Sequence, residues 1–161
     1  MLLIGEIHIS TTALHVSRFL QIVGHDGLLC TPIARAMLPN TEEPATAVCR
    51  SAVRVLRQST ARQLDAAMLE VVQRGTAKGI KDALSATGWT MGGKTGTGSV
   101  EGAPMSKQNG WFAGLIFDPR QVARFTVATF VREGGPGGGN AAEISAGLAR
   151  FLIDGGSPNP L

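Results

Sequence analysis

Lys94 is the residue with the most chemistry around it, because it lies in two overlapping patterns. Residues 88–95 read Gly-Trp-Thr-Met-Gly-Gly-Lys-Thr and satisfy G-x-x-x-x-G-K-[ST], in which backbone amides and the lysine hold a nucleotide phosphate. The later run 115–118, Leu-Ile-Phe-Asp, imitates the apolar strand and the aspartate that hold magnesium in such enzymes. Taken alone, this pattern predicts a nucleotidase.

The neighbouring sequence does not suit a phosphate-binding loop, which needs an apolar strand before it and a helix N-terminus after it. Residues 77–86 are charged and have a helical pattern. Residues 96–104 contain Gly96, Gly98, Gly102 and Pro104. A helix there would lose about 1 kcal/mol per glycine and about 3 kcal/mol for the proline. Nucleotide binding is therefore an alternative that a strand over 92–98 would exclude.

The same lysine begins a second pattern, Lys94-Thr95-Gly96-Thr97, which in serine acyltransferases lies on an edge strand beside the nucleophile. Gly96 lets an acyl substrate lie against the strand and hydrogen bond to its main chain. Lys94 brings positive charge to the reacting centre, while the Thr95 and Thr97 hydroxyls suit a substrate carboxylate. The Thr97 amide is a candidate donor to a developing oxyanion. On these four residues alone, a plain edge strand with a solvated lysine is the alternative.

Three segments have the apolar periodicity of amphipathic helices. The first is predicted over 12–24, and the second begins after Ser59 as its cap and runs to Gly75. The last begins at Asn140 as its cap. Its inward-facing residues are predicted to be Ile144, Leu148, Phe151 and Leu152. A short helix is expected over 77–86.

Three later runs, 89–97, 111–117 and 125–131, have the length and the β-branched and aromatic content of strands. The connection 118–121 is short enough for a hairpin. These strands predict an antiparallel sheet, and the helices before and after it give an α/β (α+β) fold. The glycines over 134–139 predict a plain strand-to-helix connection, with a lid as the alternative.

The segment between the first two helices is predicted to be mostly irregular. Pro32, Pro39 and Pro44 break residues 28–47, which leaves at most short extended pieces there. A short strand is expected over 53–56.

Composition limits the class of protein. With 161 residues, 43% hydrophobic and 17% charged, the chain fits one globular domain. Fifteen Lys and Arg against 12 Asp and Glu give a net charge of +3, too weak and dispersed to indicate nucleic acid. Cys30 and Cys49 form no C-x-x-C pair and no histidine lies beside them, so no metal and no cofactor are expected. The sequence carries no targeting signal and no apolar run long enough for a membrane span.

Five blocks, in the same order, resemble the C-terminal part of the transpeptidase domain of penicillin-binding proteins. They are 12–27, which is similar to a T-P-L-Q helix ending in N-G-G, 71–77 (V-V-x-x-G-T-A), 92–97 (A-G-K-T-G-T), 111–114 (W-F-x-G), and 133–142, a glycine-bearing loop and A-A-P turn. The chain departs from these letters at Ala13, His15, His25, Asp26, Gly92 and Glu143. The order of the blocks carries more weight than any one of them.

The resemblance implies a five-stranded antiparallel sheet flanked by helices, of which this chain would retain the last three strands plus helices. It implies a D,D-transpeptidase that crosslinks peptidoglycan stem peptides, is acylated by β-lactams, and works on the periplasmic face of a bacterial inner membrane. Lys94 and Thr97 would be catalytic, and Thr95, Gly96 and Thr97 would bind substrate. A disulfide between Cys30 and Cys49 would be possible in that compartment.

The family acylates a serine in S-x-x-K, and S-x-N completes its proton relay. No serine of this sequence is followed three places on by lysine. Since both motifs precede the block matched at residue 12, residues 1–161 are expected to be the C-terminal portion of such a domain without those upstream segments. The chain alone is predicted to be inactive and to need the missing N-terminal part as its partner. It is also predicted to be poorly soluble or to self-associate through an uncovered apolar face. A serine β-lactamase or sensor of the same fold, and a noncatalytic homologue, remain alternatives.

Overall fold

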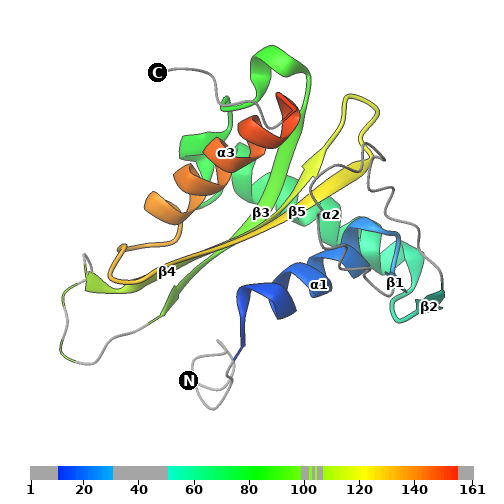
Figure 1. Cartoon of the computed structure of the whole chain (residues 1–161), viewed down its shortest axis with the longest axis horizontal. Helices are drawn as coiled ribbons and strands as arrows, with labels where there is room; N and C mark the ends of the chain where they lie inside the picture. Colours follow the sequence, from blue (N-terminus) through cyan, green and yellow to red (C-terminus); the bar gives the residue numbers. More distant parts are fainter. Residues whose placement is uncertain (1–10, 31–50, 99–101, 103, 105–106, 156–161) are drawn as a thin grey trace, which may run out of the picture.

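The computed structural model describes residues 11–30, 51–98, 102, 104 and 107–155. Its centre is a three-stranded antiparallel sheet of β3 (Thr90–Gly98), β4 (Asn109–Phe117) and β5 (Ala123–Val131), in the order β3-β4-β5. Figure 1 shows these strands running diagonally between α3 and α1. Within the described residues, β3 and β5 are therefore the two edges of this sheet.

Asp118 closes the turn between β4 and β5. Its Oδ1 accepts the amides of Arg120 at 2.9 Å and Val122 at 3.0 Å, and its Oδ2 accepts Arg124 Nε at 2.7 Å. Gln121 takes a left-handed conformation with φ of +60°. An aspartate that hydrogen bonds to the amides after it favours such a turn, so this short connection fixes the register of the hairpin.

Two helices pack on one face of the sheet. They are α1 (Ala13–Gly24) and α2 (Gln58–Gln73). The buried cluster on this side consists of Leu20, Val23, Leu115 and Phe117. At Gly92 a Cβ would lie 3.0 Å from the backbone nitrogen of Leu69, so the missing side chain lets α2 approach β3 closely.

The third helix, α3 (Asn140–Ile153), packs on the opposite face. Its buried residues are mostly small: Ala141, Ala142, Ser145, Ala146 and Ala149. They contact a cluster that contains Phe112, Ile116 and Val127 of the sheet. Two short 3₁₀ turns, η2 (Lys78–Ile80) and η3 (Ser85–Thr87), border the same side, and Ile80 and Leu84 are buried there. The sheet is thus the middle layer of three.

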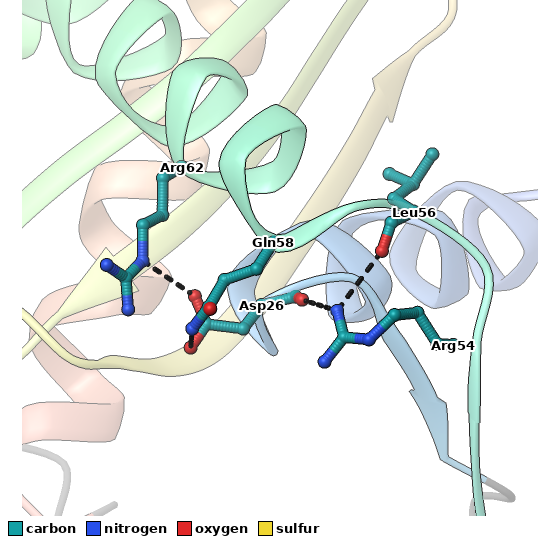
Figure 2. A network of polar contacts seen from close by, with 5 residues as sticks. All are labelled: Asp26, Arg54, Leu56, Gln58 and Arg62. Carbon is teal, nitrogen blue, oxygen red and sulfur yellow. Dashed lines mark hydrogen bonds and ion pairs between the residues drawn. The ribbon is translucent and has the colours of Figure 1, made fainter.

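A second, small antiparallel sheet pairs β1 (Leu28–Cys30) with β2 (Ala52–Arg54). Figure 2 shows how it is joined to α2 through Asp26, whose φ is +55°. The Asp26 carboxylate accepts Gln58 Nε2 at 3.0 Å and Arg62 Nε at 3.2 Å. Arg54 Nη1 donates to the carbonyls of Asp26 at 2.8 Å and Leu56 at 3.2 Å. This polar network holds the end of α1 against the start of α2.

The predicted fold class and most elements are confirmed. The structure has an antiparallel sheet flanked by helices, and α1, the three long strands, β2 and α2 lie within a few residues of their predicted positions. Within 28–47, residues 28–30 form β1, and residues 31–47 lie outside the described part of the chain.

Three local predictions were wrong. Helix α2 starts at Gln58 with Arg57 at its cap and no side-chain cap bond, so Ser59 lies inside the helix. Gly139 caps α3, and Asn140 instead donates its Nδ2 to the Gly134 carbonyl at 3.0 Å. Residues 77–86 form the two 3₁₀ turns in place of one short helix.

The predicted inward face of α3 was also wrong for three of its four residues. Ile144, Leu148 and Phe151 are 52%, 43% and 43% exposed, whereas Leu152 is partly buried against the core. The helix presents its alanines to the sheet because only small side chains permit this close approach. Its large apolar residues form a stripe on the outer surface.

Candidate active-site wall on strand β3

The Lys94-Thr95-Gly96-Thr97 motif lies on β3, an edge strand of the described sheet. Every residue from Thr90 to Gly98 is paired with β4, and Lys94 is opposite Ala113. The lysine therefore lies in extended backbone and does not open a helix.

This geometry overturns the nucleotide-binding alternative. A phosphate-binding loop requires a helix N-terminus directly after the lysine, and β3 continues as a strand to Gly98. The aspartate considered for magnesium, Asp118, follows Phe117, which pairs with Thr90 at the start of β3, whereas Lys94 lies in the middle of that strand. Asp118 is also engaged with Arg124 and the turn amides. Residues 88–95 therefore match the phosphate-binding motif in sequence but not in structure.

Lys94 points to the face of the sheet that carries α1 and α2. Directly opposite residues of an antiparallel pair share a face, and Ala113 packs against the cluster beneath α1 and α2. The Lys94 side chain is exposed, and its Nζ donates to the Thr95 carbonyl. A solvated ammonium on this face is available to a group brought up against the strand.

Thr95 lies on the other face, opposite Phe112 and in contact with the α3 side of the core. It is 8% exposed, and its Oγ1 is 2.6 Å from Thr76 Oγ1. Thr97, two residues further along β3, is exposed and pairs with Gly110. The two threonines share one face, so their hydroxyls lie on the same side of the edge strand.

The glycine-bearing connection from β5 to α3 packs directly against the motif. A Cβ at Gly137 would lie 2.3 Å from the Gly96 carbonyl and 2.0 Å from the Trp111 carbonyl. A Cβ at Gly138 would lie 2.1 Å from the Thr76 carbonyl. These distances exclude any side chain, so glycine is required where this segment crosses the ends of β3 and β4. It is the strand-to-helix connection that the sequence predicts.

Two aromatic side chains lie on the Lys94 face beside the motif. Trp111 is opposite Gly96, and its ring centroid is 4.8 Å from that of Phe130 on β5, with an interplanar angle of 48°. Phe130 is 46% exposed. The face around Lys94 therefore carries both a positive charge and exposed aromatic surface.

The cysteine prediction is tested only for one partner. Cys30 is buried and disulfide-bonded, and its Sγ is 3.0 Å from His25 Nδ1. Cys49 lies outside the described residues. Among the residues that the structure describes, no three His, Cys, Asp or Glu side chains are placed to hold a metal ion, and no helix is long and apolar enough to cross a membrane.

The pattern S-x-N occurs once, at Ser157-Pro158-Asn159, outside the described residues. It follows the Lys-Thr-Gly-Thr motif in the chain, whereas the S-x-N of the resembled family precedes it. The match therefore does not supply the upstream segment.

Sequence reasoning gave no role to Thr76, although Thr76 belongs to the G-T-A block at 75–77. The structure brings it to the Thr95 hydroxyl. The G-T-A block can be identified in the sequence, but the contact of Thr76 with β3 depends on how α2 packs across the sheet.

A family model described as the penicillin-binding protein transpeptidase domain matches residues 3–150. The match covers nearly the whole chain, and the protein therefore belongs to the penicillin-binding protein transpeptidase family. No match was found among curated proteins.

Solved structures show the same fold. The chain is similar to Pseudomonas aeruginosa PBP2, with 22% identity and a TM-score of 0.66 over 99% of this chain and 35% of that one. The transpeptidase domain of Burkholderia pseudomallei penicillin-binding protein 3 gives 24% identity and a TM-score of 0.62, over 96% and 46% of the two chains. The D,D-transpeptidase domain of an Eggerthella lenta peptidoglycan glycosyltransferase gives 22% and 0.62, over 91% and 33%. The protein thus spans between a third and a half of the length of these structures.

Proposed function

We propose that this chain forms one wall of the active site of a peptidoglycan D,D-transpeptidase and that Lys94, Thr95, Gly96 and Thr97 are its functional residues. The observation that carries the proposal is the position of Lys94 on an edge strand with its side chain exposed. A peptide laid along such an edge gains main-chain hydrogen bonds and meets the lysine, the threonine hydroxyls and Gly96 in order.

Each residue has a role that its chemistry suits. In the reaction, a serine oxygen attacks the carbonyl of a D-Ala-D-Ala peptide bond, the terminal D-alanine leaves, and an acceptor amine then displaces the serine from the ester. Lys94 stabilises negative charge at the reacting centre, and the Thr97 amide donates to the oxyanion. The Thr95 and Thr97 hydroxyls hold the carboxylate of the substrate or of a β-lactam.

The serine comes from the N-terminal part of the same domain, which is the partner we propose for this chain. Apolar residues exposed on several surfaces of the described structure support this partner. They are Leu14, Phe19, Phe130, Ile144, Leu148 and Phe151. The edge of β5 is also unpaired among the described residues. A single domain of the length of the solved relatives would have enough additional chain to cover these surfaces, on the extracytoplasmic side of a bacterial membrane.

The experiment compares the chain alone with a complete domain. The coding sequence upstream of Met1 is read, the encoded domain is expressed with this chain as its C-terminal portion, and both proteins are incubated with a fluorescent penicillin. We expect stoichiometric covalent labelling of the complete domain and none of the chain alone. Labelling of the chain alone would contradict the proposal, because the chain would then contain its own nucleophile.

The same assay separates the other members of this fold. Label that is acquired and lost again within minutes would indicate a serine β-lactamase. A complete domain that never acquires label would indicate a noncatalytic homologue. Stable label together with release of D-alanine from a stem peptide is the result expected for a transpeptidase.

A further inference from the structure

Thr76 lies in the turn that follows α2, and its hydroxyl reaches the motif on β3. Thr76 Oγ1 and Thr95 Oγ1 are 2.6 Å apart, and the pair is partly buried. Although 19 positions separate the two threonines in sequence, this is a direct contact between two of the segments that resemble the family.

The main chain fixes Thr76 from two sides. The turn is closed by hydrogen bonds from the Gly75 amide to the Glu70 carbonyl at 3.1 Å and from the Ala77 amide to the Val71 carbonyl at 3.1 Å. On the other side, the Thr76 carbonyl lies so close to Gly138 that a Cβ there would be 2.1 Å away. The Thr76 hydroxyl is therefore presented to Thr95 by a rigid backbone.

The two hydroxyl oxygens, 2.6 Å apart, are within hydrogen-bond distance, so the role of the contact depends on which hydroxyl donates. A hydroxyl has one proton to donate and two lone pairs to accept, so only one of the pair donates to the other. If Thr76 donates to Thr95, the Thr95 proton is left for an acceptor outside the pair. A carboxylate is the acceptor that favours this arrangement, since a hydroxyl that already accepts a hydrogen bond is a stronger donor.

We infer that Thr76 is a positioning residue for carboxylate recognition: it donates to Thr95 Oγ1 and thereby directs the Thr95 proton to the carboxylate of the peptide or β-lactam. The inference deepens the proposed function and rests on it. In this arrangement Thr76 acts on the ligand through Thr95, so its effect should be largest for ligands that carry the negative charge.

The test uses two ligands of nearly the same shape, one with and one without that charge: N-acetyl-D-Ala-D-Ala and its C-terminal methyl ester. Their binding to the complete domain is measured by ligand-observed saturation-transfer NMR, because the chain alone forms only one wall of the proposed site. The variants are Thr76→Val, which removes the hydroxyl at nearly constant shape, and Thr76→Ser, which keeps it. A hydrogen bond to a charged group is worth enough for Thr76→Val to weaken binding of the acid about five- to tenfold, with the ester changed less than about twofold. Thr76→Ser is expected to restore preference for the acid.

The outcomes distinguish this inference from the function on which it rests. A wild-type domain that binds neither ligand, or binds acid and ester equally, would contradict the carboxylate role of the wall, and the inference with it. A wild-type domain that prefers the acid, with an unchanged preference in Thr76→Val, would overturn the inference alone. Equal weakening of both ligands would also overturn it, because that result indicates a merely structural role. If Thr76→Val does not fold, Thr76→Ser decides: a folded Thr76→Ser domain without preference for the acid overturns the inference.

Discussion

Lys94 lies directly opposite Ala113 in the ladder between β3 and β4, and this pairing holds the lysine in an extended strand. The sequence around Lys94 matches both a phosphate-binding motif and an acyl-transfer motif. The pairing decides between them, because a phosphate-binding lysine needs a helix and an acyl-transfer lysine needs an edge strand. It also places Lys94 and Thr95 on opposite faces, so that the charge and the buried hydroxyl act from different sides of the strand.

Because Gly137 packs so closely against the sheet, adding a single methyl group there is predicted to lower the stability of the chain strongly. In Gly137→Ala, the added Cβ would lie 2.0 Å from the Trp111 carbonyl, and the connection would have to move away from β3 and β4. We expect a loss of about 2 kcal/mol or more in the free energy of unfolding, measured by chemical denaturation followed by circular dichroism.

Gly147 supplies the matched control for that substitution. It lies within α3, and a Cβ added there would meet no neighbouring element within 4 Å. Gly147→Ala should therefore stabilise the chain by about 0.5 to 1 kcal/mol through helix propensity. Equal effects of the two alanines would show that the connection does not pack against the motif.

Asp65 predicts a pH dependence of stability. Burial, reinforced by the negative charge of Asp26, raises the pKa of Asp65 to about 6, and the Asp65 Oδ1 is buried with no hydrogen-bond partner among the described residues. A raised carboxyl pKa gives stability that is present below the ordinary pKa and is lost as the pH rises through about 6. The unfolding free energy should therefore fall between about pH 4 and pH 7.

The Asp65→Asn variant tests this assignment. Because the side chain is only partly buried, solvent screening reduces the effect, and we expect the variant to be about 1 kcal/mol more stable than the wild type at about pH 7.5. The two proteins should converge near about pH 4. Parallel stability curves across this range would show that Asp65 is not the group that titrates.

Asp26 is expected to have the opposite effect on the pH dependence of stability. Hydrogen bonds from Gln58 and Arg62 lower the pKa of Asp26, so its contribution to stability is present at neutral pH and is lost as the pH falls through this lowered value. Asp26→Asn keeps a residue type that tolerates the left-handed conformation but removes the charge. The exposed network should be worth about 0.5 kcal/mol at neutral pH and less at high salt, as measured by denaturant unfolding at two salt concentrations. An equal loss at both salt concentrations would argue against an ionic contribution.

The outer stripe of α3 predicts self-association of the chain. Ile144 and Leu148 are exposed one turn apart, and the double variant Ile144→Lys, Leu148→Lys should lower the sedimentation coefficient at a given concentration while leaving the helix content unchanged. Ala142 is fully buried, so Ala142→Lys is the control that should unfold the chain. A wild-type chain that sediments as a monomer at all concentrations would contradict this prediction.

The sequence predicted those parts of the fold that depend on local pattern. The apolar spacing before Gly24 and the β-branched and aromatic runs of the three long strands were sufficient to predict α1 and the sheet, and the residues around Lys94 were sufficient to predict that the lysine lies on a strand. The orientation of α3 was predicted wrongly because the large apolar side chains were expected to face the sheet. The small alanine side chains face it instead, since they allow the helix to pack closely. The contact of Thr76 with Thr95 arises only when α2 and its turn pack against β3, and no local pattern contains that distance.

The most direct test of the central claim is the rate at which penicillin acylates the complete domain, measured for the wild type and for Lys94→Ala. Lys78, an exposed lysine of η2, provides the control as Lys78→Ala. If Lys94 forms the cationic wall of the site, its removal should lower the second-order rate constant about 100-fold or more, as for the loss of other groups that stabilise a developing oxyanion. Lys78→Ala should react as the wild type does. Acylation of the Lys94→Ala domain at the wild-type rate would contradict the account.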